Sequence, residues 1–344
     1  MASPEFMRAI RFDVPGGPEV LSPIELSLPT RSPGSALVRI DFAGVNYIDT
    51  YHRSGLYPVS LPFLPGVEAA GVIEAVGRDT AGWTEGDRVA WVMMPGTYAE
   101  FASVPLERLV RLPASLSTEM AAATLLQGMT AHYLAHGVRE TRPGDTALVH
   151  AAAGGTGGLL VQMLSATGAR VIATCGTPKK AALVRELGAD EVILYTQEDF
   201  AERTRALTAG RGVDVVYDSV GASTFEGSLA ALRTRGLLCL FGQASGPVPP
   251  FALERLNGAG SLFVTRPSLA HYISDRAALV ARSSAVFSAL EKGQLSQRIG
   301  GRYPLEDAAR AHSDLESRST TGKLVLASGG VEREIPVKNK GGSI

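Results

Sequence analysis

This chain has few cysteines and no excess of charge of either sign. Only two of the 344 residues are cysteines, Cys175 and Cys239, and each lies within an apolar run that predicts a buried strand. We therefore expect no disulfide, but two reduced core thiols of a cytoplasmic protein. The 33 basic and 34 acidic residues leave a formal net charge of -1, which gives no general attraction to nucleic acid or to an anionic membrane.

Long apolar runs are missing as well. No stretch approaches the roughly 20 apolar residues of a membrane span. No basic, apolar, small-residue signal opens the chain, so we expect no membrane partner. The first six residues, MASPEF, are typical of an expression-vector remnant and are left out of the fold prediction. Residues 329–344 are polar and turn-rich, which predicts a loose tail.

What the chain does have is 38 glycines and two kinds of repeating pattern. Short apolar strands broken by Gly and Pro run from residue 7 to about residue 104 and predict a β-rich, barrel-like domain. Residues 116–135 predict a bridging helix with Ser117 as its N-cap. From residue 146 to residue 267, apolar strands alternate with helical segments, which is typical of a doubly wound parallel sheet. A last strand at 321–327 is expected to rejoin the first domain.

The segment 146–180 is the most informative one. An apolar strand enters the turn AAGGTGG, which contains Gly154, Gly155, Thr156 and Gly157 and precedes a helix. Glycines allow a pyrophosphate to approach the backbone, and the N-terminus of the next helix offers it free N–H groups. The alternative is a glycine-rich surface turn without a ligand, which the flanking strands disfavour.

The end of the following strand indicates which dinucleotide binds. An NAD site usually places an acidic side chain there to hold the ribose 2′-hydroxyl. No acid stands between Arg170 and Lys180, and Thr174, Gly176, Thr177 and Lys180 offer hydroxyls, an amide and a cation instead. These groups suit a 2′-phosphate, so the sequence predicts NADPH as the cofactor.

Further candidate cofactor contacts follow the later strands, because parallel sheets bind cofactors at the carboxyl ends of their strands. They are Ser219 after the fourth strand, Phe241 and Gly242 after the fifth, and Phe263 and Thr265 in the expected sixth. Asp218 ends the fourth strand, and we interpret it as a residue that fixes a loop rather than as a catalytic acid.

Five motifs occur in order along the chain: GVNYIDTYHRSGLY (44–57), LPGVEAAG (64–71), AAAGGTGG (151–158), VVYDSVG (215–221) and FVTRPSL (263–269). Together they resemble the quinone oxidoreductase, or zeta-crystallin-like, branch of the medium-chain dehydrogenase/reductase superfamily. The resemblance implies an α/β protein with a GroES-like domain (7–130 and 268–328) and a Rossmann NADPH-binding domain (131–267). It also implies a homodimer in which outer strands of the two sheets pair across a two-fold axis.

The resemblance assigns cofactor contacts to individual residues. Ala152 stands where the usual phosphate turn has its first glycine, as in this family. Lys180 is implied to bind the 2′-phosphate with Tyr195 beside it. Gln127 and Thr130 are implied to face the nicotinamide carboxamide.

The segment 44–57 supplies the catalytic candidates. By resemblance, Asn46 hydrogen-bonds near the nicotinamide or its ribose. Asp49 and Tyr51 either line the acceptor pocket or supply a proton through water, and Tyr57 is a further wall of the pocket. Two structural alternatives stay open: rim aromatics for Tyr51 and Tyr57, and a hydrogen bond to backbone for Asp49, which we favour. Arg318 and Lys323 are each expected to contact a phosphate or to close the cleft, and the alternative for both is solvated surface charge.

Metal ligands are missing where related zinc enzymes have them. Asn46 stands in place of a Cys, Val67 in place of a His, and no four-cysteine lobe is present. His132 and His136 are one helical turn apart, but no third ligand accompanies them, and Tyr133 stands where a zinc protease has Glu. The sequence therefore predicts a zinc-free enzyme.

These observations predict an NADPH-dependent oxidoreductase that transfers a hydride to a quinone. Quinones are already electrophilic, so they need a Lewis acid less than alcohols or ketones do. One alternative is reduction of an activated double bond in an alkenal or enone, because the same hydride geometry serves both. An alternative of another class is an RNA-binding or structural zeta-crystallin-like protein, against which the near-zero net charge argues.

Overall fold

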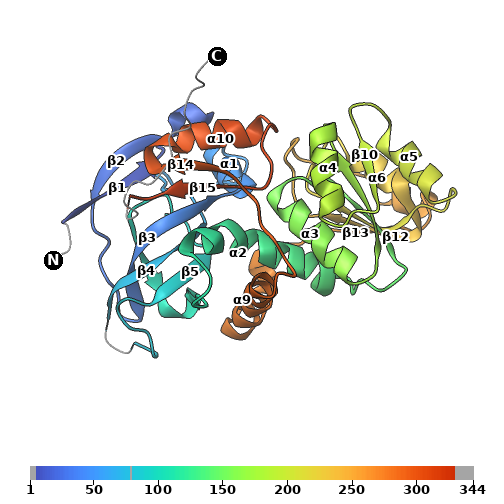
Figure 1. Ribbon diagram of the computed structural model, residues 1–344. Coiled ribbons are helices and arrows are strands. Elements are labelled where there is room, and N and C mark those ends of the chain that lie inside the picture. The colour runs from blue at the N-terminus through green and yellow to red at the C-terminus, as the bar shows by residue number, and fades with distance from the viewer. Residues whose placement is uncertain (1–4, 78–79, 330–344) are drawn as a thin grey trace, which may run out of the picture.

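The computed structural model describes residues 5–77 and 80–329. Figure 1 shows two lobes, a β-rich lobe built from both ends of the chain and an α/β lobe built from its middle. Residues 1–4 of the predicted vector remnant and residues 330–344 of the predicted tail lie outside the described residues. Phe6, which the sequence analysis left out of the fold, is the first residue of strand β1 (Phe6–Arg11).

The β-rich lobe contains the strands expected near the N-terminus. Strand β1 pairs antiparallel with β2 (Ser22–Ser27). A seven-stranded sheet has the order β14-β15-β3-β4-β5-β7, and β6 also pairs with β3. Its strands are β3 (Ser35–Val45), β4 (Glu68–Val76), β5 (Arg88–Val92), β6 (Phe101–Pro105), β7 (Val110–Arg111), β14 (Ile299–Pro304) and β15 (Lys323–Ala327). The short helix α1 (Tyr47–Arg53) directly follows β3.

The bridging helix α2 (Thr118–Tyr133) runs from the β-rich lobe to the α/β lobe. The side chain of Ser117 accepts a hydrogen bond from the backbone N–H of Met120, which confirms the predicted N-cap. A π-helical turn, Leu134–Val138, continues α2. Because α2 packs on strands β3, β4 and β5 and also on helix α3, it joins the two lobes.

The α/β lobe is a six-stranded parallel sheet with the order β10-β9-β8-β11-β12-β13. Numbered along the chain, this order is 3-2-1-4-5-6, that of the Rossmann fold. The strands are β8 (Thr146–Val149), β9 (Arg170–Cys175), β10 (Glu191–Leu194), β11 (Val213–Asp218), β12 (Leu232–Leu240) and β13 (Phe263–Thr265). The helices are α3 (Gly155–Ala166), α4 (Pro178–Glu186), α5 (Phe200–Leu207), α6 (Phe225–Ala231) and α7 (Glu254–Gly258).

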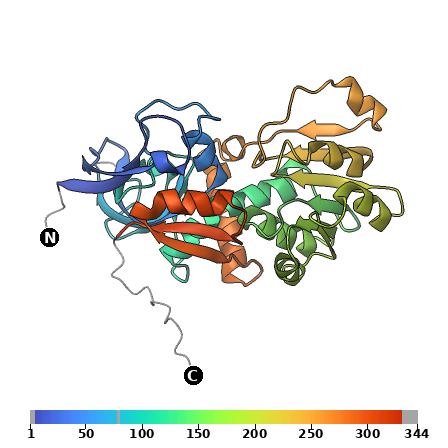
Figure 2. The same ribbon diagram turned by 90° about the horizontal axis from the view of Figure 1, so that it is seen from above.

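The C-terminal part returns to the β-rich lobe, as predicted. It contains the helices α8 (Leu269–Tyr272), α9 (Arg276–Glu291) and α10 (Ala308–Glu316). Strand β15 pairs antiparallel with β3, and Figure 2 shows α10 lying along β14 and β15. The sequence analysis missed the short or solvent-facing strands β2, β7 and β14, whose apolar residues are too few to form a pattern.

Apolar side chains form a core in the α/β lobe, a main and a smaller core in the β-rich lobe, and a shared core around α2. Cys175 and Cys239 are buried free thiols. Within the described residues, no helix combines the length and the apolar character that crossing a membrane would require.

Candidate active site

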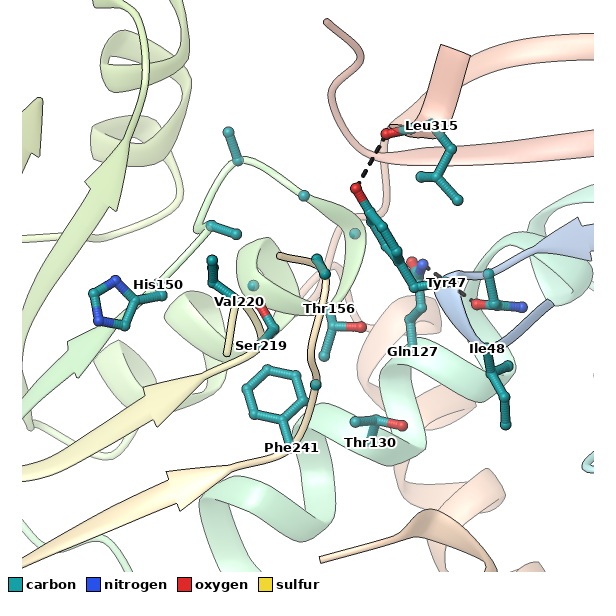
Figure 3. A pocket seen from close by; sticks show the side chains of 18 of the residues that line it. Tyr47, Ile48, Gln127, Thr130, His150, Thr156, Ser219, Val220, Phe241 and Leu315 are labelled. Atoms are coloured by element: carbon teal, nitrogen blue, oxygen red, sulfur yellow. Dashed lines mark hydrogen bonds between the residues drawn. The ribbon is translucent and has the colours of Figure 1, made fainter. Parts of the chain in front are cut away.

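A cavity of about 630 Å³ lies between the two lobes. The α/β lobe contributes the ends of β8, β9, β11 and β12, where the order of the parallel sheet changes direction. The β-rich lobe contributes α1, α2 and the segment that leads into β15. In Figure 3, Gln127, Thr130 and Phe241 lie close together along one side of this cavity, and Tyr47 and Ile48 stand at one end. Such a crevice is where open parallel sheets bind their ligands.

The glycine turn between β8 and α3 lines one end of the cavity. Gly154 is the N-cap of α3, and no side chain caps this helix. The first N–H groups of α3 therefore have no partner within the helix and are available to an anion. A Cβ atom on Gly157 would lie 2.5 Å from the carbonyl oxygen of Ala151, so only glycine allows this close approach of α3 to the turn. The backbone N–H of Gly322 donates to the carbonyl oxygen of Ala153 at 3.0 Å, which joins the two lobes at this turn.

Lys180 in α4 and Tyr195 directly after β10 both line the cavity near the end of β9. A Cβ atom on Gly176 would approach the Tyr195 hydroxyl to 2.8 Å, so the glycine at this position makes room for the Tyr195 side chain. The Nζ atom of Lys180 donates to the carbonyl oxygen of Arg318 at 2.6 Å, and Arg318 also lines the cavity. This arrangement fits a 2′-phosphate, since a cation, a hydroxyl and an open backbone face the same space.

Two hydroxyls of the predicted cofactor site already have hydrogen-bond partners within the protein. Thr177 caps α4 by accepting the backbone N–H of Lys180, and it does not line the cavity. Thr174 lines the cavity, but its Oγ1 lies 2.9 Å from Nδ1 of the buried His150. Burial lowers the pKa of His150, so the ring is neutral at neutral pH. The sequence analysis did not single out His150.

Asn46 lines the cavity but has no free hydrogen-bonding capacity. Its Nδ2 donates to Oε2 of Glu68 at 2.9 Å and to the carbonyl oxygen of Gly44 at 3.2 Å. Its Oδ1 accepts from Nζ of Lys323 at 2.6 Å and from Nε2 of Gln127 at 3.5 Å. Because both amide protons and both lone pairs have partners, Asn46 binds a nicotinamide or its ribose only if one of these bonds is given up.

Lys323 and Glu68 form a fully buried ion pair behind Asn46, with 2.6 Å between Nζ and Oε2. Lys323 is neither exposed nor part of the cavity lining, so its expected roles as a phosphate contact or as surface charge are wrong. The other oxygen of Glu68 accepts the backbone N–H of Leu126 at 2.6 Å, which connects β4 and β15 to helix α2. Burial lowers the pKa of Lys323, and the nearby carboxylate of Glu68 opposes that change. The pair therefore fixes the side chain of Asn46 in the wall of the cavity.

Asp49 does not line the cavity. Its Oδ2 accepts the backbone N–H of Asn46 at 2.8 Å and the hydroxyl of Tyr98 at 3.1 Å, whereas its buried Oδ1 has no partner. Burial raises the pKa of Asp49 to about 7. We favoured a structural role for Asp49 in which it forms a hydrogen bond with the backbone. Its carboxylate accepts the backbone N–H of Asn46, which agrees with that interpretation.

A one-way chain of hydrogen-bond donors leads from the buried Arg53 to Asp49. Arg53 donates through Nη1 to Nδ1 of His312 at 3.1 Å, so Nε2 of His312 carries the proton and faces the Tyr98 oxygen at 3.0 Å. Burial lowers the pKa of His312 to about 3, which keeps the ring neutral. Arg53 also pairs with Glu316 at 2.9 Å.

Tyr51 and Tyr57 line the other end of the cavity, with ring centroids 5.2 Å apart. The hydroxyl oxygen of Tyr51 accepts the backbone N–H of Gln243 at 3.1 Å, so its proton is available to a ligand. Burial raises the pKa of Tyr51 to about 12, which keeps the hydroxyl protonated at neutral pH. The hydroxyl of Tyr57 accepts from Arg266, a cavity residue that the sequence analysis did not consider.

Most of the predicted site residues meet at this one cavity. Those that line it are Asn46, Tyr51, Tyr57, Gln127, Thr130, Gly154, Gly155, Thr156, Gly157, Thr174, Gly176, Lys180, Tyr195, Ser219, Phe241, Gly242 and Arg318. Those that do not are Asp49, Ala152, Thr177, Phe263 and Thr265. Phe263 and Thr265 lie on the edge strand β13, where Phe263 is 59% exposed, so the expected cofactor contacts of these two residues are not found at the cavity.

Asp218 fixes a loop, as the sequence analysis proposed. Its carboxylate accepts the backbone N–H groups of Val220 and Gly221 and the hydroxyls of Thr224 and Ser228. All of these donors follow Asp218 closely in the chain. The carboxylate thereby holds the 219–224 segment against the cavity.

The site does not fit a zinc ion. The ammonium group of Lys323 lies 2.6 Å from both Asn46 Oδ1 and Glu68 Oε2, and would repel a divalent cation there. Nδ1 of His132 faces the guanidinium of Arg282 at 3.1 Å, so the His132 and His136 pair also meets a positive charge. Within residues 5–77 and 80–329, no three His, Cys, Asp or Glu side chains gather as a metal site.

Two family models match the chain. Residues 155–278 match the family described as zinc-binding dehydrogenase, and residues 32–114 match the alcohol dehydrogenase GroES-like domain. A quinone oxidoreductase from Pseudomonas aeruginosa is 44% identical over 93% of this chain and 99% of its own. A 2-haloacrylate reductase from a Burkholderia species is 41% identical over 90% of this chain and 96% of its own.

A solved structure shares the whole two-lobed arrangement. It is the quinone oxidoreductase of Escherichia coli in complex with NADPH, which is 43% identical and has a TM-score of 0.91. The match covers 93% of this chain and 99% of that one.

Proposed function

The chain belongs to the quinone oxidoreductase branch of the medium-chain dehydrogenase/reductase superfamily, and on that premise we propose that it reduces quinones with NADPH. The observation that carries the proposal is that one and the same cavity is lined by the glycine turn before the uncapped helix α3, by Lys180 and by Tyr51. One end suits a phosphorylated nucleotide, and the other suits a flat, electron-poor ring. We assign residues 131–267 to nucleotide binding, and residues 7–130 and 268–328 to the acceptor and the closing wall.

NADPH, when bound, supplies a hydride from C4 of its nicotinamide ring. The glycine turn and the N-terminus of α3 bind its pyrophosphate, and Lys180 with Tyr195 binds the 2′-phosphate. Gln127 and Thr130 lie where they orient the nicotinamide ring. Since the hydroxyl of Thr130 already donates to the carbonyl oxygen of Leu126 at 2.8 Å, its oxygen acts as an acceptor there.

Tyr51 supplies the proton to the reduced acceptor. Its hydroxyl is held by the N–H of Gln243 and retains its own proton, so it donates to a quinone oxygen as negative charge develops. Tyr57 packs edge-on against Tyr51 and excludes water from the acceptor. No metal ion has a role in this proposal, because the residues around Asn46 bind an ammonium group instead.

Steady-state oxidation of NADPH tests the proposal. With 1,4-benzoquinone as acceptor, we expect turnover that dialysis against a chelator does not reduce. We expect slower turnover with a 2-alkenal, and weaker use of NADH. Absence of NADPH oxidation with every quinone would contradict the proposal.

Reduction of an activated carbon–carbon double bond is the second candidate. The 41% identity to a 2-haloacrylate reductase favours it. Faster turnover of alkenals or enones than of quinones in the same assay would rank this activity first. RNA binding is not part of the proposal, because a net charge of -1 gives no general attraction to nucleic acid.

We also propose a homodimer in the cytoplasm. Strand β13 is an edge of the parallel sheet, and its Phe263 and Val264 are 59% and 40% exposed. An exposed apolar edge pairs readily with a second strand, so a second copy of this chain is its expected partner. The two free cysteines support a reducing compartment.

A further inference from the structure

Arg266 is a fixed cation in the acceptor end of the cavity. It follows β13 directly and lines the cavity with Tyr51 and Tyr57. Its Nη1 donates to the carbonyl oxygen of Leu240 at 3.2 Å, and its Nη2 donates to the hydroxyl of Tyr57 at 3.1 Å. These two contacts come from different lobes, so they hold the guanidinium in one place.

The hydrogen-bond acceptors that hold Arg266 carry no negative charge. Both acceptors named above are neutral oxygens. In the part of the chain that the structure describes, no carboxylate forms an ion pair with Arg266. A guanidinium has five N–H donors, and two have partners here, which leaves three for a ligand.

The cavity has separate positive groups at its two ends. Its charged lining residues are Lys180, Arg318 and Arg266, and no Asp or Glu is among the lining residues that the structure describes. Lys180 and Arg318 contact each other at the 2′-phosphate end. Arg266 instead lies beside the tyrosines: burial raises the pKa of Tyr51 to about 12, and the charge of Arg266 opposes that rise. The cofactor phosphates therefore account for Lys180 and Arg318 but leave Arg266 without an anion.

We propose that Arg266 binds a carboxylate of the acceptor, and that among the double-bond acceptors of the second candidate activity those carrying a carboxylate are preferred. This proposal rests on the hydride-transfer function above and names its substrate class. The planar guanidinium fork matches a carboxylate, and the charge-assisted bonds are stronger than bonds to a neutral ester. Pairing also offsets the negative charge that would otherwise make the conjugated double bond a poorer hydride acceptor.

The reaction balances as a two-electron reduction. One carbon of the acceptor double bond gains the hydride supplied by NADPH, and the π electron pair moves to the adjacent carbon. That carbon takes a proton, delivered through Tyr51 from water. The products are the saturated carboxylate and NADP⁺, and the bond between the guanidinium and the carboxylate is unchanged.

A matched pair of acceptors tests the proposal: 3-benzoylacrylate and its methyl ester, which differ only in the carboxylate charge. We expect the wild-type protein to have the higher kcat/KM with the acid. Arg266→Gln is expected to lower kcat/KM for the acid by about ten- to one-hundred-fold and to lower it much less for the ester. Arg266→Lys keeps the positive charge but loses the planar pair of donors. Its kcat/KM with the acid is expected to lie between those of the wild type and Arg266→Gln. Arg31→Gln removes an exposed arginine outside the cavity and is the control, expected to match wild type.

Titration calorimetry with the saturated analogues, 3-benzoylpropionate and its methyl ester, gives a readout that needs no turnover. Wild-type protein with NADP⁺ is expected to bind the acid more tightly, and Arg266→Gln is expected to abolish that preference. If no acceptor is reduced but the binding preference follows Arg266, the proposed function fails and the assigned carboxylate site stands. Equal effects on acid and ester, or no binding of the acid by wild type, would overturn the site. Unchanged thermal unfolding of both variants verifies their folding.

Discussion

The polar side chains around the cavity are mostly committed to partners within the protein. Asn46 uses its whole carboxamide on Glu68, Lys323, Gly44 and Gln127. Lys180 and Arg266 differ, because each has neutral protein acceptors and no carboxylate partner among the described residues. These two cations are therefore the residues at which a single substitution best separates ligand binding from protein stability.

Lys180→Ala is expected to weaken NADPH binding much more than NADH binding. The change removes a charge-assisted contact to the 2′-phosphate, which contributes roughly 1.5–3 kcal/mol. The dissociation constants of both cofactors, measured by calorimetry, check this. Lys179→Ala is the control, since Lys179 is the exposed neighbour on the same helix and does not line the cavity. Equal losses for both cofactors would refute the assignment of the 2′-phosphate site.

Asp49→Asn is expected to flatten the pH dependence of stability. The folded-state pKa of Asp49 is raised by burial from 3.8 to about 7, so the folded protein binds the proton more tightly than the unfolded chain does. The contribution of this group is full below pH 3.8 and is lost as the pH rises through 7, by up to about 1.4 kcal/mol per pH unit. The variant should therefore gain stability relative to wild type across this range.

Urea unfolding at several pH values measures this effect. The asparagine oxygen can still accept the N–H of Asn46 and the hydroxyl of Tyr98, and its amide group replaces the oxygen that has no partner. Parallel stability curves for the two proteins would show that Asp49 is ionised throughout, contrary to its raised pKa.

At the scale of elements, helix α3 and strand β15 decide the shape of the cavity. Helix α3 approaches the turn at 151–154 so closely that its third residue must be glycine. Strand β15 places Lys323 behind β3 and β4, where its ammonium group reaches both Asn46 and Glu68. The close approach of α3 to the turn thus shapes one wall of the cavity, and the buried ion pair of Lys323 and Glu68 fixes the wall at Asn46.

Gly157→Ala is expected to weaken NADPH binding and to destabilise the protein by about 1–3 kcal/mol. The added Cβ would lie 2.5 Å from the Ala151 carbonyl oxygen and 2.9 Å from the Ala152 Cα, so α3 must move away from the turn. Cofactor titration and thermal unfolding measure both effects. Gly158→Ala on the same helix is the control, because its Cβ would meet the movable Leu187 side chain at 3.1 Å. Similar losses for both variants would count against a special role for Gly157.

Lys323→Met and Glu68→Gln are each expected to destabilise the protein by about 3–5 kcal/mol, because each leaves a buried polar partner uncompensated. The double variant should lose clearly less than the sum of the single variants. Urea unfolding completes the double-mutant cycle. Arg8→Met is the control, since it breaks the exposed pair with Glu100 and is expected to cost at most about 1 kcal/mol. Strict additivity would mean that the two buried groups do not interact.

At the scale of the whole molecule, the two lobes enclose the ligand space only because they contact each other directly. Gly322 meets the phosphate turn, Lys180 meets Arg318, and Arg266 joins Leu240 to Tyr57. Strand β13 forms one edge of the parallel sheet, and its apolar side chains Phe263 and Val264 are exposed to solvent. One side of the α/β lobe thus forms the site, and the other offers a surface for a second copy.

Val264→Lys is expected to shift the protein from dimer to monomer. A charged side chain on an exposed edge strand opposes strand pairing with another chain. Size-exclusion chromatography with light scattering measures the mass directly. Val280→Lys on α9 is the control, because Val280 is 39% exposed and Val264 is 40% exposed. A monomeric wild-type protein would remove the basis of the dimer proposal.

The predictability of each element followed the strength of its local pattern. The parallel strands β8, β9 and β11 are buried on both faces, so their continuous apolar runs were visible in the sequence. Strand β2 is mostly solvent-facing and is defined by its pairing with β1, which no local pattern records. Arg266 lies within the FVTRPSL motif but was not selected, because its role depends on Tyr57, which is far away in the chain.

The sequence by itself determined the two-lobed fold, the glycine turn and the replacement of zinc ligands by Asn46 and Val67, since each depends on local residue types and their order. Only the tertiary structure decided which polar atoms remain free for a ligand. It placed the ammonium group of Lys323 against Asn46, and it left the guanidinium of Arg266 in the cavity lining, where none of the described residues contributes a carboxylate. The physical reason is that hydrogen-bonding capacity is used up by partners that come from distant parts of the chain.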